Sequence, residues 1–296
     1  MTDLGLSWGV REQVGGPLTL AVLEDWNGCP RLEGYPGSFG YVLATHFSDT
    51  FGFGKAVSRS RFEMERVTDS VVGVALSAGG RGAWLVSQDG VVLAVGDTPR
   101  CRPVSRIEPG TSVAGIKAAP GGMGYWLFGQ DGSIGAYGHA VDHGSLRESS
   151  PGIHLDQPIV SMAVTPGGGG YWLAAADGGV FCFGDAEYFG SAVTVGLGSR
   201  IVSIASTFYG RGYWMASEDG RVLCFGDAEY LGSPAELGVG GNETVIGMCA
   251  SSTTLGYWTA TSSGTVRAFG NVHFLGTKPI GIVIPRVCAF DVGCWN

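Results

Sequence analysis

The chain has 296 residues, of which 45% are hydrophobic, and a formal net charge of −8 with only three lysines. This acidic composition excludes a nucleic-acid-binding surface built on a basic stripe. The sequence contains no run of eighteen apolar residues, which a transmembrane helix would need, so we expect no membrane insertion. The opening residues, MTDLGLSWGVREQ, have neither the basic start nor the long apolar core of a signal peptide, and we expect no cleaved leader.

A glycine followed two positions later by a tryptophan recurs along the whole chain. Successive markers lie 42, 42, 46, 42, 44 and 37 residues apart, and a second glycine follows each of the first six markers by twelve residues. A repeat of this period predicts an architecture of stacked, similar units. The seven marker positions are Val42, Trp84, Trp126, Trp172, Trp214, Trp258 and Trp295.

Each repeat predicts four short antiparallel β-strands. In the copy at Trp172, residues 171–173 and 180–183 are rich in β-forming side chains and flank the Asp-Gly pair at 177–178, which favours a tight hairpin turn. Residues 187–189 predict the next strand, and residues 201–206 predict the strand before the following marker. Four strands in about 42 residues are typical of one blade of a β-propeller.

The two ends of the chain predict one further blade. Residues 1–16 resemble the outer half of a repeat, with Trp8 in the place of the phenylalanine before the second glycine, and residues 287–296 resemble the inner half. Joined, the two segments would close the ring and leave no open sheet edge. We therefore predict an all-β, seven-bladed β-propeller in a single domain of residues 1–296, with a ring of six or eight blades as the alternative.

The strand order places the Asp-Gly turns and the connections between blades on one face, and the Phe-Gly-Asp corners on the other. Variable connections such as residues 55–70 and 140–158 belong to the first face, and binding residues usually lie on variable loops over a rigid scaffold.

The longest gap between markers contains Asp142, His143 and His154, whose spacing permits a metal or proton-transfer site. The alternative is that these are solvated loop side chains. Trp26 lies in the long loop of residues 25–39 and could be exposed for contact. We predict these four residues as the binding residues.

The remaining carboxylates and tryptophans favour structural roles. The aspartates of the turns have short side chains that bond nearby backbone, and they are dispersed around a ring rather than converging on one calcium ion. The marker tryptophans lie inside predicted strands, which favours packing between blades over sugar stacking. The glycine before each tryptophan predicts a close approach of the backbone.

The seven cysteines include no C-x-x-C pair, so a zinc ribbon is unsupported and no metal site is predicted. Most of the thiols are interpreted as small buried side chains. Cys29 and Cys294, both near the closing blade, are the one pair that could form a disulfide.

No sequence motif for a catalytic nucleophile, a zinc protease or a phosphate-binding loop occurs, and we predict no catalytic residues and no cofactor. The alternative is a glycan hydrolase or lyase that uses side chains near the central channel. Glu24, Lys117 and Asp291 lie on or near predicted innermost strands and are the candidates for it.

Two neighbouring repeats read GYWLAAADGGVFCFGDAEYFGS and GYWMASEDGRVLCFGDAEYLGS. This unit resembles a repeat of actinobacterial surface and secreted proteins, and of minor tail proteins in phages of those bacteria. The resemblance covers nearly the whole chain and is weaker at Val42 and at both termini. It implies a β-propeller with a binding role and supplies no catalytic residues.

The resemblance and the expected lack of a leader together favour a non-enzymatic virion protein at a phage tail tip. We expect it to bind other tail proteins or a host envelope glycan, and not nucleic acid. A non-viral scaffold at the cell surface is the alternative.

Overall fold

The computed structural model describes most of the chain between residues 18 and 274. The described residues are 18–23, 40–45, 50–54, 71–77, 82–103, 105, 107, 110–149, 154–239, 243–251, 255–272 and 274.

Within these residues the chain forms six antiparallel sheets of three strands each. The sheets are β1–β3 (Leu18–Leu23, Gly40–Thr45, Thr50–Gly54), β4–β6 (Val71–Leu76, Gly82–Ser87, Val92–Gly96), β7–β9 (Val113–Ala118, Gly124–Gly129, Ile134–Gly138), β10–β12 (Ile159–Val164, Gly170–Ala175, Val180–Gly184), β13–β15 (Ile201–Ser206, Gly212–Ser217, Val222–Gly226) and β16–β18 (Val245–Ala250, Gly256–Thr261, Val266–Gly270).

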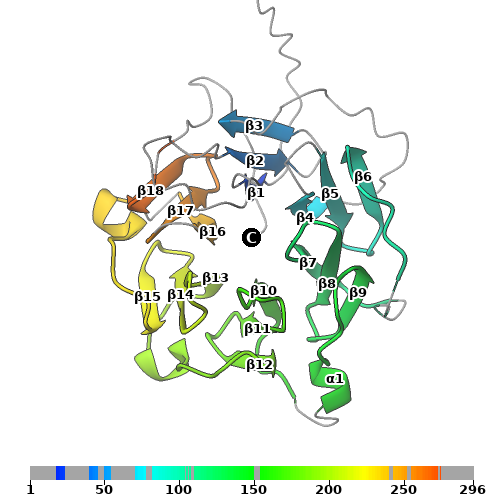
Figure 1. The fold of residues 1–296 in the computed structure, drawn as a ribbon. Coiled ribbons are helices and arrows are strands. Elements are labelled where there is room, and N and C mark those ends of the chain that lie inside the picture. The colour runs from blue at the N-terminus through cyan, green and yellow to red at the C-terminus, as the bar shows by residue number, and fades with distance from the viewer. Residues whose placement is uncertain are drawn as a thin grey trace, which may run out of the picture.

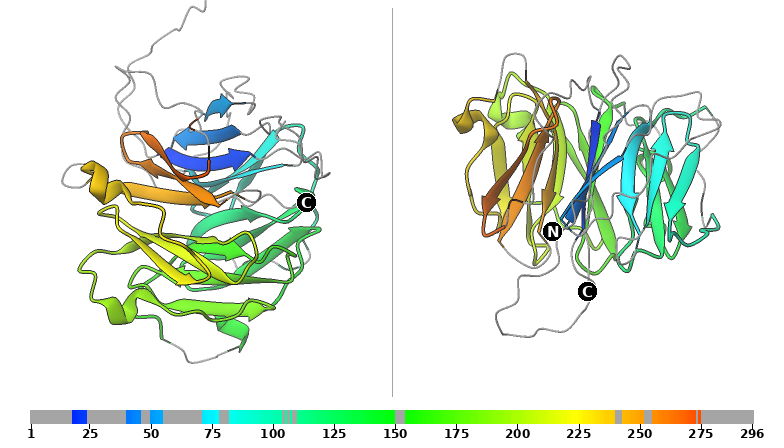
Figure 2. Two further views of the ribbon diagram at one scale, coloured as in Figure 1. Left: turned by 60° about the vertical axis from the view of Figure 1, so that its left-hand side comes forward. Right: turned by 90° about the horizontal axis from the view of Figure 1, so that it is seen from above.

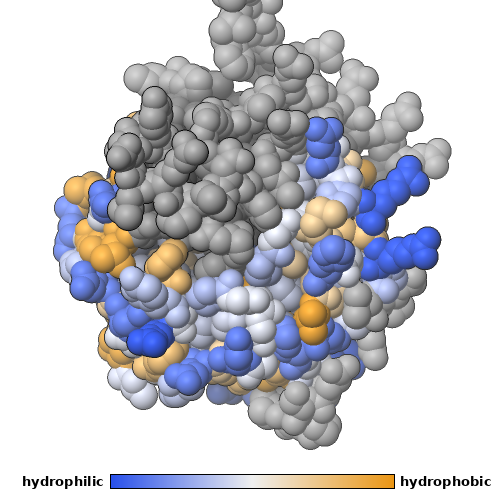
Figure 3. Space-filling view, viewed as in Figure 1, coloured by the Kyte–Doolittle hydropathy of each residue, from blue (hydrophilic) through white to orange (hydrophobic). Residues whose placement is uncertain are grey.

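The six sheets stand around a common axis like the blades of a propeller (Figure 1). The first strand of each sheet is innermost, and the inner strands follow one another in chain order, with β1 beside both β4 and β16. Seen from the side, the sheets form one layer about the axis (Figure 2). On the face shown in Figure 3, the coloured surface is largely hydrophilic, and apolar side chains are seen at its edge over the β13–β15 and β16–β18 sheets.

The two glycines of each repeat mark the ends of the strands, as the sequence predicts. The marker glycine begins the second strand of every described sheet, and the glycine fourteen residues later ends the third strand. These two glycines are paired across the ladder, for example Gly170 with Gly184 and Gly212 with Gly226. The fixed spacing is therefore the length of one hairpin, which tolerates no insertion.

The predicted close backbone approach at the marker glycine is confirmed. A Cβ atom on Gly212 would lie 2.3 Å from the carbonyl oxygen of Phe225, and one on Gly170 would lie 2.3 Å from that of Phe183. Any side chain here would collide with the backbone of the neighbouring strand. Glycine is thus required by the pairing of the two strands themselves.

The Asp-Gly hairpins are one residue longer than a two-residue turn. Gly178 donates its N–H to the Ala175 carbonyl at 2.9 Å and has a φ of 94°, while Ala175 donates to Gly179 at 2.9 Å. This is a type I turn followed by a left-handed glycine, which is the usual three-residue hairpin. The side chain of Asp177 accepts the N–H of Gly179 at 2.9 Å, which is the structural role expected for the turn aspartates.

The predicted strand at residues 187–189 is wrong. These residues lie in a connection without regular structure after β12, and the outer segment of the next repeat has the same form. Instead of a fourth ladder, side chains bind this backbone: Trp172 Nε1 donates to the carbonyl of Glu187 at 2.7 Å. The connections after β9, β12 and β15 each contain one short helix, which are α1 (Leu146–Ser149), η2 (Ala192–Val195) and η3 (Pro234–Leu237).

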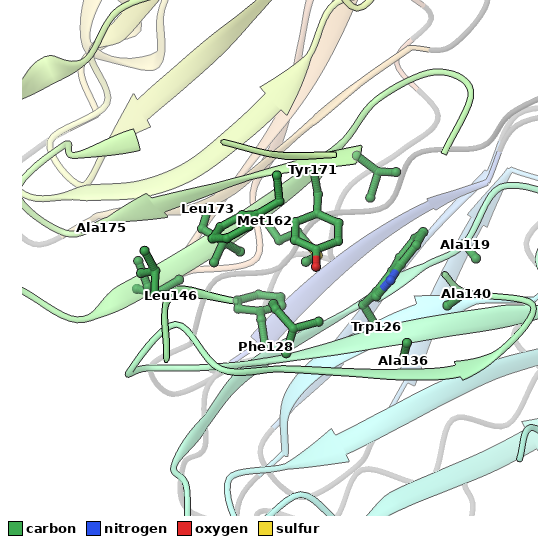
Figure 4. Packing of buried hydrophobic residues seen from close by; sticks show 14 residues of the cluster. Ala119, Trp126, Phe128, Ala136, Ala140, Leu146, Met162, Tyr171, Leu173 and Ala175 are labelled. Carbon is green, nitrogen blue, oxygen red and sulfur yellow. The ribbon is translucent and has the colours of Figure 1, made fainter. Parts of the chain in front are cut away.

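The core lies between neighbouring sheets, where the five described marker tryptophans are buried as predicted, as Figure 4 shows for Trp126. Between the β7–β9 and β10–β12 sheets, Trp126 packs its ring 5.9 Å from that of Tyr171, beside Met162 and Leu173. The same tryptophan–tyrosine contact recurs at 5.7 Å between Trp172 and Tyr213. Because each contact joins two sheets, burial of these rings fixes the angle between successive blades.

The inner strands are also tied to one another close to the axis. Ser161 accepts the N–H of Ile204 on the next inner strand at 3.2 Å, and Ser203 accepts that of Met248 at 3.1 Å. Each of these serines follows a β-bulge at the start of its strand. A bulge changes the local direction of the backbone, and here the serine after it forms a hydrogen bond to the neighbouring blade.

The predicted faces are confirmed by the strand order. Ile201, which begins β13, donates to the carbonyl of Ala176 at the turn of the preceding sheet at 2.8 Å. We call this side the turn face and the side with the Phe-Gly-Asp corners the corner face. The predicted closing blade, residues 1–16 and 287–296, lies outside the described residues. Among the residues that are described, no helix is long and apolar enough to cross a membrane.

Candidate binding surfaces

Asp142 and His143 lie together on the connection that leaves β9. Trp126 Nε1 donates to the carbonyl of Val141 at 2.8 Å, which fixes the start of this segment. The N–H of His143 donates to the hydroxyl of Tyr171 at 3.3 Å, and that hydroxyl donates to the carbonyl of Gly144. The segment is therefore bound by one side chain from its own sheet and one from the next.

Both side chains of this pair make local contacts. Asp142 accepts the N–H of Gly144 at 2.9 Å, as an aspartate does in a turn. The His143 ring lies 5.6 Å from that of Tyr171, and its Nε2 is 3.0 Å from the carbonyl oxygen of Gly168 on the β10–β11 loop. Both residues are half-buried.

The neighbouring blade shows the same arrangement without a histidine. There Phe189 donates its N–H to the hydroxyl of Tyr213 at 3.3 Å, and the two rings lie 5.9 Å apart. His143 thus occupies the place of Phe189 in a contact between blades. This equivalence supports a packing role for His143, in addition to the polar contact that its Nε2 makes.

His154 is exposed and lies eleven residues further along the same connection. Across the described residues, no hydrogen bond or ion pair joins it to Asp142 or His143, and no group of three His, Cys, Asp or Glu side chains is arranged to bind a metal ion. Trp26 lies outside the described residues, so its predicted exposure stays a prediction.

The residues proposed for a site at the channel are described only in part. Lys117 is on the innermost strand β7, as predicted, and is only 2% exposed. Glu24 and Asp291 lie outside the described residues. The described innermost strands otherwise consist of apolar residues and small residues such as Ser161 and Ser203.

Carboxylates on the turn face are occupied by hydrogen bonds. Burial acts to raise the pKa of Asp219, but hydrogen bonds from Arg221 and Ser217 and the charge of Arg221 outweigh it and lower the pKa. A hydrogen bond from Ser87 likewise lowers the pKa of Asp89. These aspartates stay ionised as acceptors for their own turns.

Among the described cysteines, Cys249 is buried as predicted, whereas Cys101, Cys182 and Cys224 are free thiols that are only half-buried. Burial raises the pKa of Cys182 to about 11, so this thiol is protonated near neutral pH and is a poor nucleophile. The equivalent Cys224 has a pKa raised by the same cause. Cys29 and Cys294 lie outside the described residues, and their pairing remains a prediction.

A surface that the sequence analysis did not single out lies on the outer rim. Tyr188, Tyr230 and Phe274 occupy the same position in three successive repeats, sixteen residues after the marker tryptophan, and are 61%, 53% and 56% exposed. The repeated FGDAEY was a usable signal. The sequence pattern instead predicts a strand at residues 187–189, in which the tyrosine side chain would pack against a neighbouring strand or blade.

No protein-family model and no curated protein matches the chain. The β-propeller domain of Cps50 (Swd1) from Myceliophteria thermophila superposes with a TM-score of 0.51 at 11% identity, covering 86% of each chain. A protein of unknown function from Bacteroides thetaiotaomicron gives a TM-score of 0.51 at 11% identity, over 87% of this chain and 77% of that one.

The chain folds as a β-propeller. The identity to these two propellers is too low to carry more than the fold, because one fold hosts many unrelated functions. The function of this propeller has to be argued from its own surfaces.

Proposed function

We propose that this propeller is a non-enzymatic component of a phage tail tip that binds neighbouring tail proteins or a glycan of the host envelope. The repeat sequence supports the setting, since the GYWL and FGDAEY segments resemble minor tail proteins of actinobacterial phages. An extracellular or cell-surface scaffold is the alternative setting.

The observation that carries a binding role is the rim. Large apolar side chains are exposed at equivalent places on successive blades, while the tryptophans beneath them are buried. Exposed apolar surface set in a polar surround is typical of a contact site. Asp142, Asp177 and His143, by contrast, are engaged in turns and in contacts between blades.

We also propose that the ring has seven blades, closed by residues 1–16 and 287–296. The repeat count and the complementary halves at the two ends support this number. Six sheets are described, and β1 lies beside β16, so a six-bladed ring is the outcome that would replace it.

The binding role can be tested with the purified protein. We expect it to cross-link to other structural proteins in intact virions, or to bind host cells in a pull-down that soluble envelope glycan inhibits. The proposal fails if the protein neither binds host cells nor assembles with virion proteins. Release of reducing ends from cell-wall polysaccharide would instead establish the alternative, a glycan-active enzyme.

A further inference from the structure

The exposed apolar side chains of the described residues are concentrated on the outer segments of the blades. Of the eleven large apolar side chains that are exposed among the described residues, seven lie on the segments that follow a third strand. The seven are Val141, Tyr188, Val193, Val195, Tyr230, Leu237 and Phe274.

The backbone that carries Tyr188 and Tyr230 is fixed on both sides. Trp214 Nε1 donates to the carbonyl of Glu229 at 2.7 Å, as Trp172 does to Glu187. After each exposed tyrosine, a buried tyrosine of the next blade binds the backbone, and Tyr257 does so by donating to the carbonyl of Gly232. The exposed rings therefore project from ordered backbone, which reduces the entropy lost on binding.

Carboxylates accompany these two rings. In each FGDAEY segment an exposed glutamate directly precedes the tyrosine, and no ion pair in the described part of the chain neutralises it. The aspartate of each segment is engaged instead by a threonine, Asp185 by Thr165 and Asp227 by Thr207, both at 2.7 Å. Tyr230 also donates to Glu236 Oε1 at 2.6 Å, which fixes the orientation of its ring. The two glutamates are Glu187 and Glu229.

We propose that this acidic-aromatic rim, defined by Tyr188, Tyr230 and the glutamates Glu187 and Glu229 beside them, binds a basic, arginine-bearing segment of a neighbouring protein. A guanidinium can stack on an exposed ring and also form paired hydrogen bonds to a carboxylate, so it uses both groups at once. An anionic envelope glycan would be repelled by the same carboxylates. The inference rests on the proposed binding role and selects the protein partner over the glycan.

Fluorescence anisotropy of a labelled deca-arginine peptide tests the rim, with a Gly-Ser peptide of equal length as the neutral probe. The protein should bind only the basic peptide, with affinity that falls as salt rises. The double variant Y188A/Y230A should weaken binding about tenfold or more, which is the size of effect expected from losing a cation–π contact at each of two sites. Glu229→Gln should weaken it about threefold or more.

Two variants serve as matched controls. Phe274→Ala removes a ring from the same rim position, where no exposed carboxylate adjoins it among residues 270–272, and Asp156→Asn removes an exposed charge on another connection. Both should leave affinity within about twofold of the parent protein. All these positions are exposed, and unchanged circular dichroism would confirm that each variant is folded.

Two outcomes overturn the inference. If Asp156→Asn weakens binding as much as Glu229→Gln, the attraction follows net charge and the rim is not a site. If Y188A/Y230A abolishes binding to host glycan while the basic peptide binds as before, the rim is a glycan site. In that second case the proposed binding role stands and only the choice of partner fails, so the two failures are distinguishable.

Discussion

The residues that define each repeat act in pairs across the boundary between two blades. Trp172 binds the carbonyl of Glu187 on its own outer segment, and Tyr213 from the next blade binds Phe189 and Gly190 on that same segment. The segment has no strand ladder, so these side-chain bonds replace one. The tryptophan and tyrosine of the GYW sequence therefore serve adjacent blade boundaries, which explains why they recur together.

Removal of one hydroxyl should show the strength of this contact. Tyr213→Phe leaves the carbonyl of Gly190 and the N–H of Phe189 without their partner, and we expect a loss of about 1–3 kcal/mol in the free energy of unfolding. Urea denaturation would measure it. Tyr209→Phe is the control, because Tyr209 is 70% exposed and its hydroxyl should contribute little. Equal stability of the two variants would contradict the role given to Tyr213.

Burial of the same tyrosines predicts unfolding in alkali. Burial raises the pKa of Tyr213 to about 12 and also raises that of Tyr125 and Tyr257, whereas an unfolded tyrosine titrates near 10. Above pH 10 the unfolded chain therefore releases protons that the folded chain retains. The stabilisation from these groups is complete below pH 10 and is lost as the pH rises towards 12.

Urea midpoints measured between pH 8 and pH 11.5 would check this dependence. The midpoint should fall above pH 10, and Tyr213→Phe should make the fall shallower because one shifted group has been removed. A slope that Tyr213→Phe leaves unchanged would show that other groups govern alkaline unfolding.

At the scale of one blade, the β16–β18 sheet differs from its neighbours. It lacks the turn aspartate, and Glu243 from the preceding connection accepts hydrogen bonds from Thr261 at 2.5 Å and Ser263 at 2.6 Å in its place. Burial acts to raise the pKa of Glu243, but these hydrogen bonds and the charge of Arg267 outweigh it and lower the pKa. The turn of this sheet is therefore also bound by a carboxylate, but that carboxylate comes from the preceding connection and not from the turn itself.

The same sheet also carries two buried polar atoms without partners. Within the described part of the chain, Thr259 Oγ1 and Arg267 Nη1 have no hydrogen bond, and the two residues are paired across β17 and β18. In the preceding sheet the corresponding pair is Met215 and Leu223, which is apolar. This sheet has therefore retained a polar pair where packing alone would favour an apolar one.

Replacing the unpartnered hydroxyl should stabilise the protein. Thr259→Val keeps the shape of the side chain and removes the cost of burying an unpaired group, so we expect a gain of about 1 kcal/mol in the free energy of unfolding. Thr261→Val is the matched control two residues along the same strand. It removes a donor to Glu243 and should destabilise the protein by about 1 kcal/mol or more. Thermal or urea unfolding measures both, and the same sign for the two variants would contradict this account.

For the whole molecule, the features that could be predicted from the sequence are those set by residues at fixed positions within each repeat. The ends of the strands, the propeller and the burial of the tryptophans all follow from glycines and aromatics at fixed spacing. The outer segment could not be predicted, because Glu187 and Phe189 are bound by side chains that lie fifteen or more residues away. The rim was missed because these same distant contacts, and not a strand, hold the segment that carries it. The local sequence also does not show that His143 takes the place that Phe189 has in the neighbouring blade.

Closure of the ring is the property on which the number of blades depends. If residues 1–16 and 287–296 form one blade, Trp8 stands in the place of Phe183 and Trp295 in that of Trp172. Those two residues lie on the paired strands β12 and β11 of one sheet, with their side chains in the cores on its two opposite faces. Substitutions on two paired strands couple through the backbone that they share, whereas those at distant sites add.

A double-mutant cycle on Trp8→Ala and Trp295→Ala therefore tests the seven-bladed ring. We expect each substitution to lower the free energy of unfolding, and the double variant to differ from the sum of the two by at least about 0.5 kcal/mol. Trp8→Ala combined with Tyr209→Ala is the control pair, which should be additive because Tyr209 is exposed on a described loop. Additivity of the Trp8 and Trp295 effects would place the two ends of the chain apart and favour six blades. The innermost strands β16 and β1, which contact each other in the structure, would then belong to neighbouring blades.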